Sequence, residues 1–440
     1  MDDILRRTAT GHPINGWDIT TLNTTNLFNM RKLSSFLFPA FFSLLIFLTA
    51  CSPAPASPVS TSPAVPGIVI PTPPACTTVL TEPTPGPETP SLFPPESKTD
   101  HMRGAENPVV TITEYSDYQD WMSGLFAKEA SRLLEAHPDE LRIVSRIFPL
   151  IETNDKAALA AQAAEAALEQ GKFWEMHDLL YAQQKNWVSL SAQDFEQWLT
   201  AQVSALGMNV GQFQTDLKRE DILAKVQQAW AGGQKIGLPG TPLILINGQI
   251  YGGPLDYNSL NDIIELITLG KRQYASCPAV TVQQNKEYIA TLHTEKGEVV
   301  IQLFADKAPM TVNSFLFLAN SGWYDHITFH RVLPDLFAQT GDPSGTGKGN
   351  PGYYIITEID PSLTFDKPGR VAMVNSGPDT SGSQFFITYE PTAQYNGQYT
   401  IFGEVLSGMQ VLKQLTPRDP QPGTDLPPGD QLINITIEEK

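Results

Sequence analysis

Short runs of β-branched and aliphatic residues recur in the middle of the chain, separated by segments whose apolar residues have helical spacing. The runs are typical of buried strands and lie at 109–115, 141–148 and 243–246. The helical segments lie at 124–136, 155–170 and 258–269, and further helices fill the span to 234. Asn247-Gly248 predicts a two-residue hairpin turn into 249–251. This order of elements predicts an α/β domain with a helical insertion over residues 105–275.

The last third of the chain has a different pattern, with apolar positions alternating along short segments between glycines and prolines. Residues 289–304 are expected to form a hairpin, and residues 309–319 a helix that ends before Gly322. Antiparallel strands accompanied by one or two helices predict a closed β-barrel over residues 288–440.

The region before residue 105 carries neither pattern. Met30-Arg31-Lys32 precedes an apolar run at 33–50, and small residues lead to Cys51. This arrangement resembles a bacterial lipoprotein signal over 30–51, which implies cleavage before Cys51, lipidation of its thiol and anchoring to a membrane. A single membrane span is the alternative, but the run of about 18 residues is marginal for crossing a bilayer. Residues 1–29 are expected to be untranslated or disordered.

Residues 52–104 predict a linker. Fourteen of the 44 positions from 52 to 95 are proline, which removes hydrogen-bond donors and favours an extended backbone. We expect this segment to act as a tether between the lipid anchor and the folded domains.

Composition narrows the classes of function. The net charge of −18 argues against nucleic acid as a partner. The seven histidines show no ligand spacing, so we expect neither a metal nor another cofactor. The three cysteines form no C-x-x-C pair, which excludes a dithiol redox motif.

One cation in an apolar segment is the first candidate for chemistry. Arg331 lies in the run Phe329-His330-Arg331-Val332-Leu333, and alternation along a strand directs its guanidinium to one face. Phe337 and Gln339 follow within eight residues. A shallow apolar pocket with one fixed guanidinium and one amide suits a neutral ligand that bears a carbonyl group. His330 faces the opposite way and is expected to be structural.

A second block, Met373-Val374-Asn375-Ser376-Gly377 through Ser383-Gln384-Phe385-Phe386-Ile387, follows about forty residues later. Together the two blocks resemble the cyclophilin family of peptidyl-prolyl isomerases over about residues 288–417. The resemblance implies an eight-stranded barrel with two helices, and proline-containing unfolded or extended polypeptides as partners.

The resemblance also implies roles for individual residues. Arg331, Phe337, Gln339 and Phe386 would be catalytic, with Gln339 orienting Arg331. The substrate-binding residues would be Leu336, Val374, Asn375, Gln384, Tyr395 and Tyr399. Phe385 is expected to belong to the core.

The sequence departs from the commonest family pattern at five positions: Leu336, Phe337, Thr340, Gln394 and Tyr399. These departures lower the expected catalytic efficiency. They leave open a non-catalytic peptide-binding chaperone, or holdase, as an alternative.

Residues of the α/β domain carry a second resemblance. Glu114-Tyr115-Ser116-Asp117, Phe173-Trp174-Glu175-Met176-His177-Asp178 and Thr241-Pro242 are similar to DsbA-type thioredoxin-fold proteins. In that family a Cys-x-x-Cys pair follows the first motif, whereas this chain has Asp120 and Ser123. Because exchange requires a thiolate, we expect a redox-inactive domain. Pro242 would be the family's cis-proline, and the groove beside it would bind clients.

Cys76 and Cys277 lie just outside this domain, on either side. They could pair in an oxidising extracytoplasmic compartment, or they could be unrelated thiols. Residues 276–287 are expected to form a second linker. The chain as a whole is thus interpreted as a lipid-anchored, extracytoplasmic isomerase of a bacterial cell membrane that assists protein folding.

Overall fold

The computed structural model describes residues 75–79, 93–283, 285–421, 426 and 428–440. The expected lipoprotein signal, Cys51 and most of the proline-rich linker lie outside the described residues. Among the described residues, no helix is both long and apolar enough to cross a membrane.

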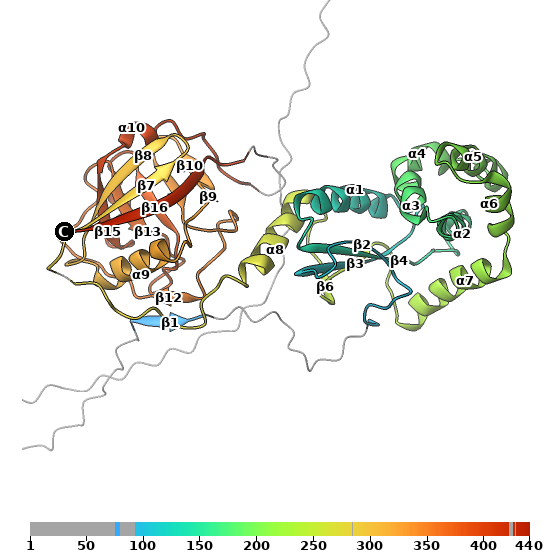
Figure 1. Ribbon diagram of the computed structural model, residues 1–440, viewed down its shortest axis with the longest axis horizontal. Coiled ribbons are helices and arrows are strands. Elements are labelled where there is room, and N and C mark those ends of the chain that lie inside the picture. The colour runs from blue at the N-terminus through green and yellow to red at the C-terminus, as the bar shows by residue number, and fades with distance from the viewer. Residues whose placement is uncertain (1–74, 80–92, 284, 422–425, 427) are drawn as a thin grey trace, which may run out of the picture. The chain divides into compact units, whose positions relative to one another are not determined.

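The first domain is built on a sheet whose described strands have the order β2-β4-β3-β5-β6 (Figure 1). The strands are β2 (His101–Gly104), β3 (Val110–Ser116), β4 (Leu141–Ile147), β5 (Leu243–Ile246) and β6 (Gln249–Tyr251). β3 pairs in parallel with β4, and the other pairs are antiparallel. Every residue of β3 except Thr111 is buried, as expected for a central strand.

Two helices complete this sheet's main core. Side chains of α1 (Trp121–Ala136) and α8 (Tyr257–Leu269), among them Phe126, Leu133 and Leu260, pack against β3, β4 and β5. α1 begins at Trp121 because the Asp120 carboxylate accepts hydrogen bonds from the main-chain N–H groups of Met122 and Ser123.

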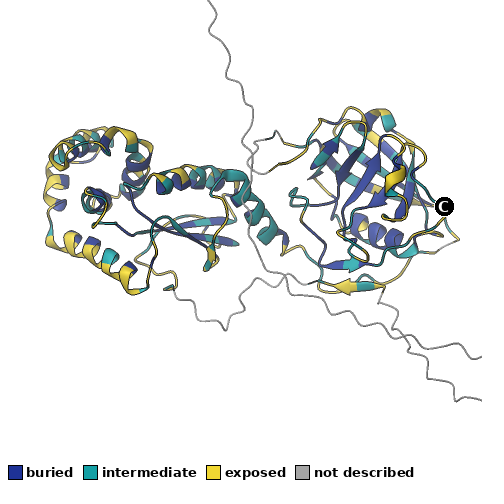
Figure 2. Cartoon of the chain, turned by 180° about the vertical axis from the view of Figure 1, so that it is seen from behind, coloured by how far each residue is buried: buried dark blue, intermediate teal, exposed yellow. Residues whose placement is uncertain are grey.

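The predicted helical insertion lies between β4 and β5. Its helices are α2 (Ala157–Leu168), α3 (Phe173–Ala182), α4 (Gln184–Trp187), α5 (Ala192–Ala205), α6 (Val210–Asp216) and α7 (Glu220–Lys235). Seven alanines of α2 are buried, and their small side chains let the neighbouring helices approach closely. In Figure 2 the middle of the sheet is largely dark blue, whereas the insertion's helices carry yellow on their outer turns.

The second domain contains a sheet of nine described strands in the order β10-β11-β14-β13-β15-β8-β7-β16-β9. Its strands are β7 (Tyr288–Thr294), β8 (Gly297–Leu303), β9 (Ile327–Thr328), β10 (Arg331–Leu333), β11 (Phe337–Thr340), β13 (Arg370–Met373), β14 (Phe385–Thr388), β15 (Ile401–Ser407) and β16 (Gln431–Glu439). The two outer strands, β9 and β10, are separated only by Phe329 and His330. The sheet therefore curls until its edges meet, which gives the barrel in Figure 1.

The strand count differs from the expected eight because β9 and β10 are short consecutive segments at opposite ends of the sheet order. The two expected helices are α9 (Pro309–Asn320) and the short α10 (Met409–Leu412), with a 3₁₀ turn at Ala393–Tyr395. The main-chain N–H groups of Met310 and Thr311 donate to the Glu358 carboxylate, which fixes the start of α9.

Parts of the two expected linkers, 52–104 and 276–287, contact the folded domains, so these linkers are shorter than predicted. β2 pairs with β4 inside the first sheet, so that domain begins before residue 105. β1 (Cys76–Thr78) pairs with β12 (Tyr353–Ile355) of the second domain. Within the expected linker 276–287, the main-chain N–H groups of Thr281 and Val282 donate to the Asn313 side chain.

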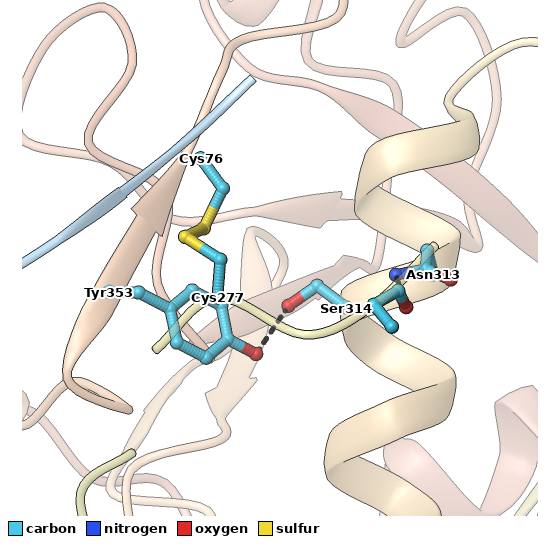
Figure 3. The surroundings of a disulfide bond; sticks show 6 residues. Cys76, Cys277, Asn313, Ser314 and Tyr353 are labelled. Carbon is cyan, nitrogen blue, oxygen red and sulfur yellow. Dashed lines mark hydrogen bonds between the residues drawn. A yellow bond between two sulfur atoms is a disulfide. The ribbon is translucent and has the colours of Figure 1, made fainter. Parts of the chain in front are cut away.

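A disulfide joins Cys76 to Cys277, with the two Cα atoms 6.1 Å apart. Figure 3 shows it beside Tyr353, whose hydroxyl lies 2.9 Å from that of Ser314 on α9. The disulfide and the β1–β12 pair therefore fasten residues from both sides of the first domain's sequence to the second domain.

Candidate active site

Strand register brings together residues that are far apart in the sequence. Arg331 on β10 lies opposite Gln339 on β11, and Gln339 lies opposite Phe386 on β14. Phe386 in turn lies opposite Ala372 on β13. Residues directly opposite each other on neighbouring strands share a face of the sheet, so these four side chains form one row.

Aromatic rings form a cluster along this row. Phe337 and Phe386 are buried, with ring centroids 5.5 Å apart, and Phe386 stacks on Phe365 at 5.9 Å. Tyr395 and Tyr399 meet the Phe386 ring edge-on at 5.8 and 5.3 Å. Leu336 and Val374 are half-buried members of the same cluster. This cluster is separate from the barrel core, to which Phe385 belongs.

Arg331 stands at the edge of the aromatic cluster. Its Cζ atom is 5.5 Å from the centroid of Phe337, and its side chain is 41% exposed. Its Nε donates a hydrogen bond of 2.8 Å to Oδ1 of Asp419. The loop that carries Asp419 is fixed because Arg418 and Val332 exchange two main-chain hydrogen bonds. A permanent charge is thus held at the edge of an apolar cluster, and only its Nε contacts Asp419 among the contacts of the described residues.

Gln339 was expected to orient Arg331 and the substrate, and its side chain contacts another residue of the predicted site. Its Nε2 donates to Oε1 of Gln384 at 3.0 Å, and Gln384 donates onward to the Gly349 carbonyl at 2.9 Å. In the described part of the chain, Arg331 is oriented by Asp419, which sequence reasoning missed. Asp419 lies in a polar loop with no pattern that points to Arg331.

Asn375 keeps its main chain available. Its side chain donates to the Gln398 carbonyl at 3.0 Å and accepts from the Gly377 N–H at 3.2 Å. Its own main-chain groups form no hydrogen bond within the described residues. A cavity of about 290 Å³ adjoins this position, lined in part by Val374, Asn375 and Gln384. Exposed main-chain groups beside a cavity can pair with an extended peptide.

His330, which precedes Arg331 in the chain, is buried. Burial lowers its pKa, although the negative charge of Asp342 acts in the opposite direction, so the imidazole is neutral at neutral pH.

Thr340 is one of the five departures from the commonest family pattern. Its hydroxyl donates a hydrogen bond of 2.9 Å to the Thr328 carbonyl, so this polar group has a partner. Gly341 next to it has φ of 98°, and a Cβ there would lie 2.4 Å from the Ser383 carbonyl oxygen.

In the first domain, Asp120 and Ser123 occupy the two positions where DsbA-type proteins have the cysteines of their redox pair. Asp120 caps α1 and accepts a 2.7 Å hydrogen bond from the Ser123 hydroxyl. The Thr241–Pro242 peptide bond is cis. Trp121 and Leu125 on α1 are 64% and 48% exposed, so apolar surface persists on this helix.

Comparison with known proteins identifies both domains. Residues 289–436 match the family described as "Cyclophilin type peptidyl-prolyl cis-trans isomerase/CLD", and residues 96–266 match the family described as "Thioredoxin".

Individual relatives match the second domain. Peptidyl-prolyl cis-trans isomerase A of Mycobacterium tuberculosis is 42% identical over 180 residues, covering 37% of this chain and 99% of that protein. Peptidyl-prolyl cis-trans isomerase-like 2 of Cryptococcus neoformans is 39% identical over 161 residues, covering 35% of this chain and 28% of that protein. A Cryptosporidium parvum cyclophilin crystal structure is 32% identical with a TM-score of 0.32, covering 34% of this chain and 98% of that chain. A relative that is 42% identical is matched over 99% of its length, and the aromatic cluster beside Arg331 agrees with that match. The chain therefore belongs to the cyclophilin-type peptidyl-prolyl cis-trans isomerases, and it also carries a thioredoxin-like domain.

Proposed function

We propose that the chain assists the folding of extracytoplasmic proteins by rotating X-Pro peptide bonds, with its thioredoxin-like domain holding the client. The row formed by Arg331, Gln339 and Phe386 beside Phe337 is the observation that carries the catalytic part.

The reaction is rotation about an amide bond and breaks no covalent bond. Its barrier is roughly 20 kcal/mol because the nitrogen lone pair is delocalised into the carbonyl group. In the twisted state the lone pair returns to the nitrogen. A cation beside that nitrogen stabilises the twisted state more than either planar state, and so accelerates rotation in both directions.

Each part of the site has a role in this scheme. Phe337 and Phe386 bury the proline ring, whose methylenes contribute about 0.8 kcal/mol each. Asn375 pairs with the substrate main chain through the groups that have no hydrogen bond among the described residues. Arg331, held by Asp419, directs its remaining N–H groups to the imide nitrogen.

An isomerase assay with a proline tetrapeptide tests the catalytic proposal. We expect Arg331→Ala to lower kcat/KM by about 100-fold, in the range found when one electrostatic donor is removed from an active site. The control is Arg219→Ala, an arginine that pairs with Asp221 in the other domain. Equal rates for wild type and Arg331→Ala would contradict the proposal.

The thioredoxin-like domain is proposed as a client-binding module. Its α1 presents Trp121 and Leu125 to solvent, and Asp120 and Ser123 supply no thiolate for disulfide exchange. An insulin-reduction assay should therefore give no rate above the uncatalysed one.

The location outside the cytoplasm is proposed from two features. Cys51 follows a lipoprotein-type signal, and the Cys76–Cys277 disulfide is typical of an oxidising compartment. Metabolic labelling with a fatty acid, compared between wild type and Cys51→Ser, would test the lipid anchor.

A non-catalytic holdase is the second candidate, favoured by the five departures from the commonest pattern. It predicts suppressed client aggregation with no isomerase rate. The tetrapeptide assay distinguishes it from the first proposal.

A further inference from the structure

The thioredoxin-like domain contains a cavity of about 390 Å³ that has no part in the proposed isomerase site. It lies between α2, α7, the end of β4 and residues 94–101, and neither residues 120–123 nor Pro242 line it. α2 and α7 are neighbours in the insertion (Figure 1). A volume of this size is typical of sites for small molecules.

Most of the cavity wall is apolar, and small residues create the space. Tyr115 and Ile147 come from the sheet, Ala161 from α2, and Val226 and Ala229 from α7. Because alanine stands on both facing helices, the helices can pack while the space between them stays open.

Gly232 on α7 also lines the cavity, although packing against its neighbours does not require a glycine at this position. A glycine inside a helix costs about 1 kcal/mol relative to alanine. The neighbouring Gly233 is required by packing, since a Cβ there would lie 2.3 Å from Cδ2 of Phe148. A Cβ at Gly232 would meet no atom within 4 Å, yet Gly232 lines the cavity.

Polar groups gather on one part of the lining. Glu165, whose side chain is 12% exposed, lies 3.0 Å from Nε2 of His101 and 2.6 Å from Nζ of Lys225. Burial raises the pKa of Glu165, but the bonds from His101 and Lys225 outweigh it and leave that pKa below its ordinary value. Glu165 is therefore ionised and forms an ion pair with Lys225.

Two hydrogen-bond donors remain for a ligand. The Lys225 ammonium carries three N–H groups, and its side chain is 45% exposed. Ser145 lines the cavity with 1% exposure, and its hydroxyl has no hydrogen-bond partner among the described residues. A buried hydroxyl without a partner is costly, so an acceptor on a ligand would restore the lost bond.

The charges of the lining favour an anion. Arg146, Lys225 and Lys235 are cations, whereas the two carboxylates are Asp100, paired with Arg146, and Glu165. The cavity lining therefore has one more cation than carboxylate, although the chain as a whole has a net charge of −18. We propose that this cavity binds a small amphipathic carboxylate, with its apolar chain or ring among the alanines and its carboxylate held by Lys225 and Ser145.

Calorimetric titration of the full-length protein with octanoate tests this proposal. A Kd on the order of 10⁻⁴ M is expected for an anion of this size. Uncharged 1-octanol should bind at least 10-fold more weakly. Ala229→Leu, which fills the cavity, should abolish binding. Ala224→Leu, the same change at an exposed position of α7 outside the lining, should leave binding unchanged.

Two polar variants keep the test decisive if Ala229→Leu fails to fold. Lys225→Gln and Ser145→Ala should each raise the Kd about 10-fold, with Lys128→Gln on α1 as the control for a lost surface charge. All of these variants should keep the wild-type isomerase rate, so failure here is distinguishable from failure of the isomerase proposal. No heat of binding up to about 10 mM octanoate, or wild-type affinity in Lys225→Gln and Ser145→Ala, would overturn the proposal.

Discussion

Arg331 has a fixed neighbour on each side, the Phe337 ring and the Asp419 carboxylate. The ring keeps one side of the guanidinium out of water, where its charge acts more strongly on a bound amide. Asp419 holds the side chain in one direction, so little conformational freedom is lost when substrate arrives. We therefore propose that catalysis at this site depends on Asp419, which positions Arg331, as well as on the cation itself.

Asp419→Ala should have a small, specific effect. An ion pair this exposed contributes about 0.2–1 kcal/mol, so kcat/KM should fall about 2- to 5-fold, mainly through kcat. Asp306→Ala, an exposed carboxylate whose Lys307 partner is 3.9 Å away, is the matched control. An Asp419→Ala enzyme with wild-type kcat would show that Arg331 needs no such support.

His330 predicts how stability depends on pH. Its folded pKa is lowered by burial, so near and below pH 6.5 the unfolded chain binds a proton that the folded chain does not. Stability should therefore be fully present above about pH 6.5 and fall on acidification, by up to about 1.4 kcal/mol per pH unit.

Urea titrations at pH 7.5 and 5.5, followed through NMR signals of the isomerase domain, would measure this dependence. His330→Gln should show a smaller difference between the two pH values, and His293→Gln, a partly exposed histidine, should behave as wild type. An unchanged difference in His330→Gln would mean that other groups cause the dependence.

Site residues could be predicted only where they fall inside a sequence motif. Arg331, Gln339 and Phe386 were assigned from the two motifs that resemble the cyclophilin family, and strand pairing in the structure places them in one row. Asp419 and Phe365 reach the site through loops, whose course depends on long-range packing. No local pattern in the sequence marks them.

At the scale of elements, regular periodicity predicted the central strands and long helices well. The helix predicted at 309–319 ends one residue later, and the hairpin at 289–304 is β7 and β8. α1 begins three residues before its predicted start because Asp120 caps it. Position 120 was interpreted from the sequence only as a lost cysteine, so this capping role was missed. β1 and β2 were missed since three or four residues in a proline-rich region carry no usable pattern.

β1 and its disulfide should stabilise the isomerase domain without affecting turnover. The entropy model gives at most about 5 kcal/mol for a cross-link with a sequence separation of 201. Replacing Cys76 and Cys277 by serine should lower the thermal midpoint by several degrees and change kcat/KM less than 2-fold. Reduced wild type should match the double variant, and identical melting of reduced and oxidised protein would contradict this account.

At the scale of the whole molecule, two domains with different chemistry share one chain. The cyclophilin-like domain has an aromatic cluster that we propose binds one proline, whereas the thioredoxin-like domain has exposed apolar side chains on α1. We propose that this domain has no redox activity, because Asp120 and Ser123 stand where DsbA-type proteins have thiols. We expect client holding and amide rotation to be separable functions.

Changing Trp121 and Leu125 together to serine should test that separation. If a client buries both side chains, each contributes about 1.5–3 kcal/mol, so the double variant should bind clients at least about 100-fold more weakly and lose most of its suppression of citrate synthase aggregation. Tetrapeptide turnover should stay at the wild-type rate. Leu223→Ser, a similar change on α7, serves as the control, and unchanged suppression in the double variant would exclude α1 as the client surface.

The central claim is that the charge of Arg331 accelerates rotation of an amide held by the aromatic pocket. NMR exchange spectroscopy on a saturating proline tetrapeptide measures that rotation directly, separately from binding. The account predicts that Arg331→Gln keeps the Kd within about 3-fold of wild type but slows rotation on the enzyme about 100-fold. Rotation within about 3-fold of the wild-type rate in that variant would contradict it.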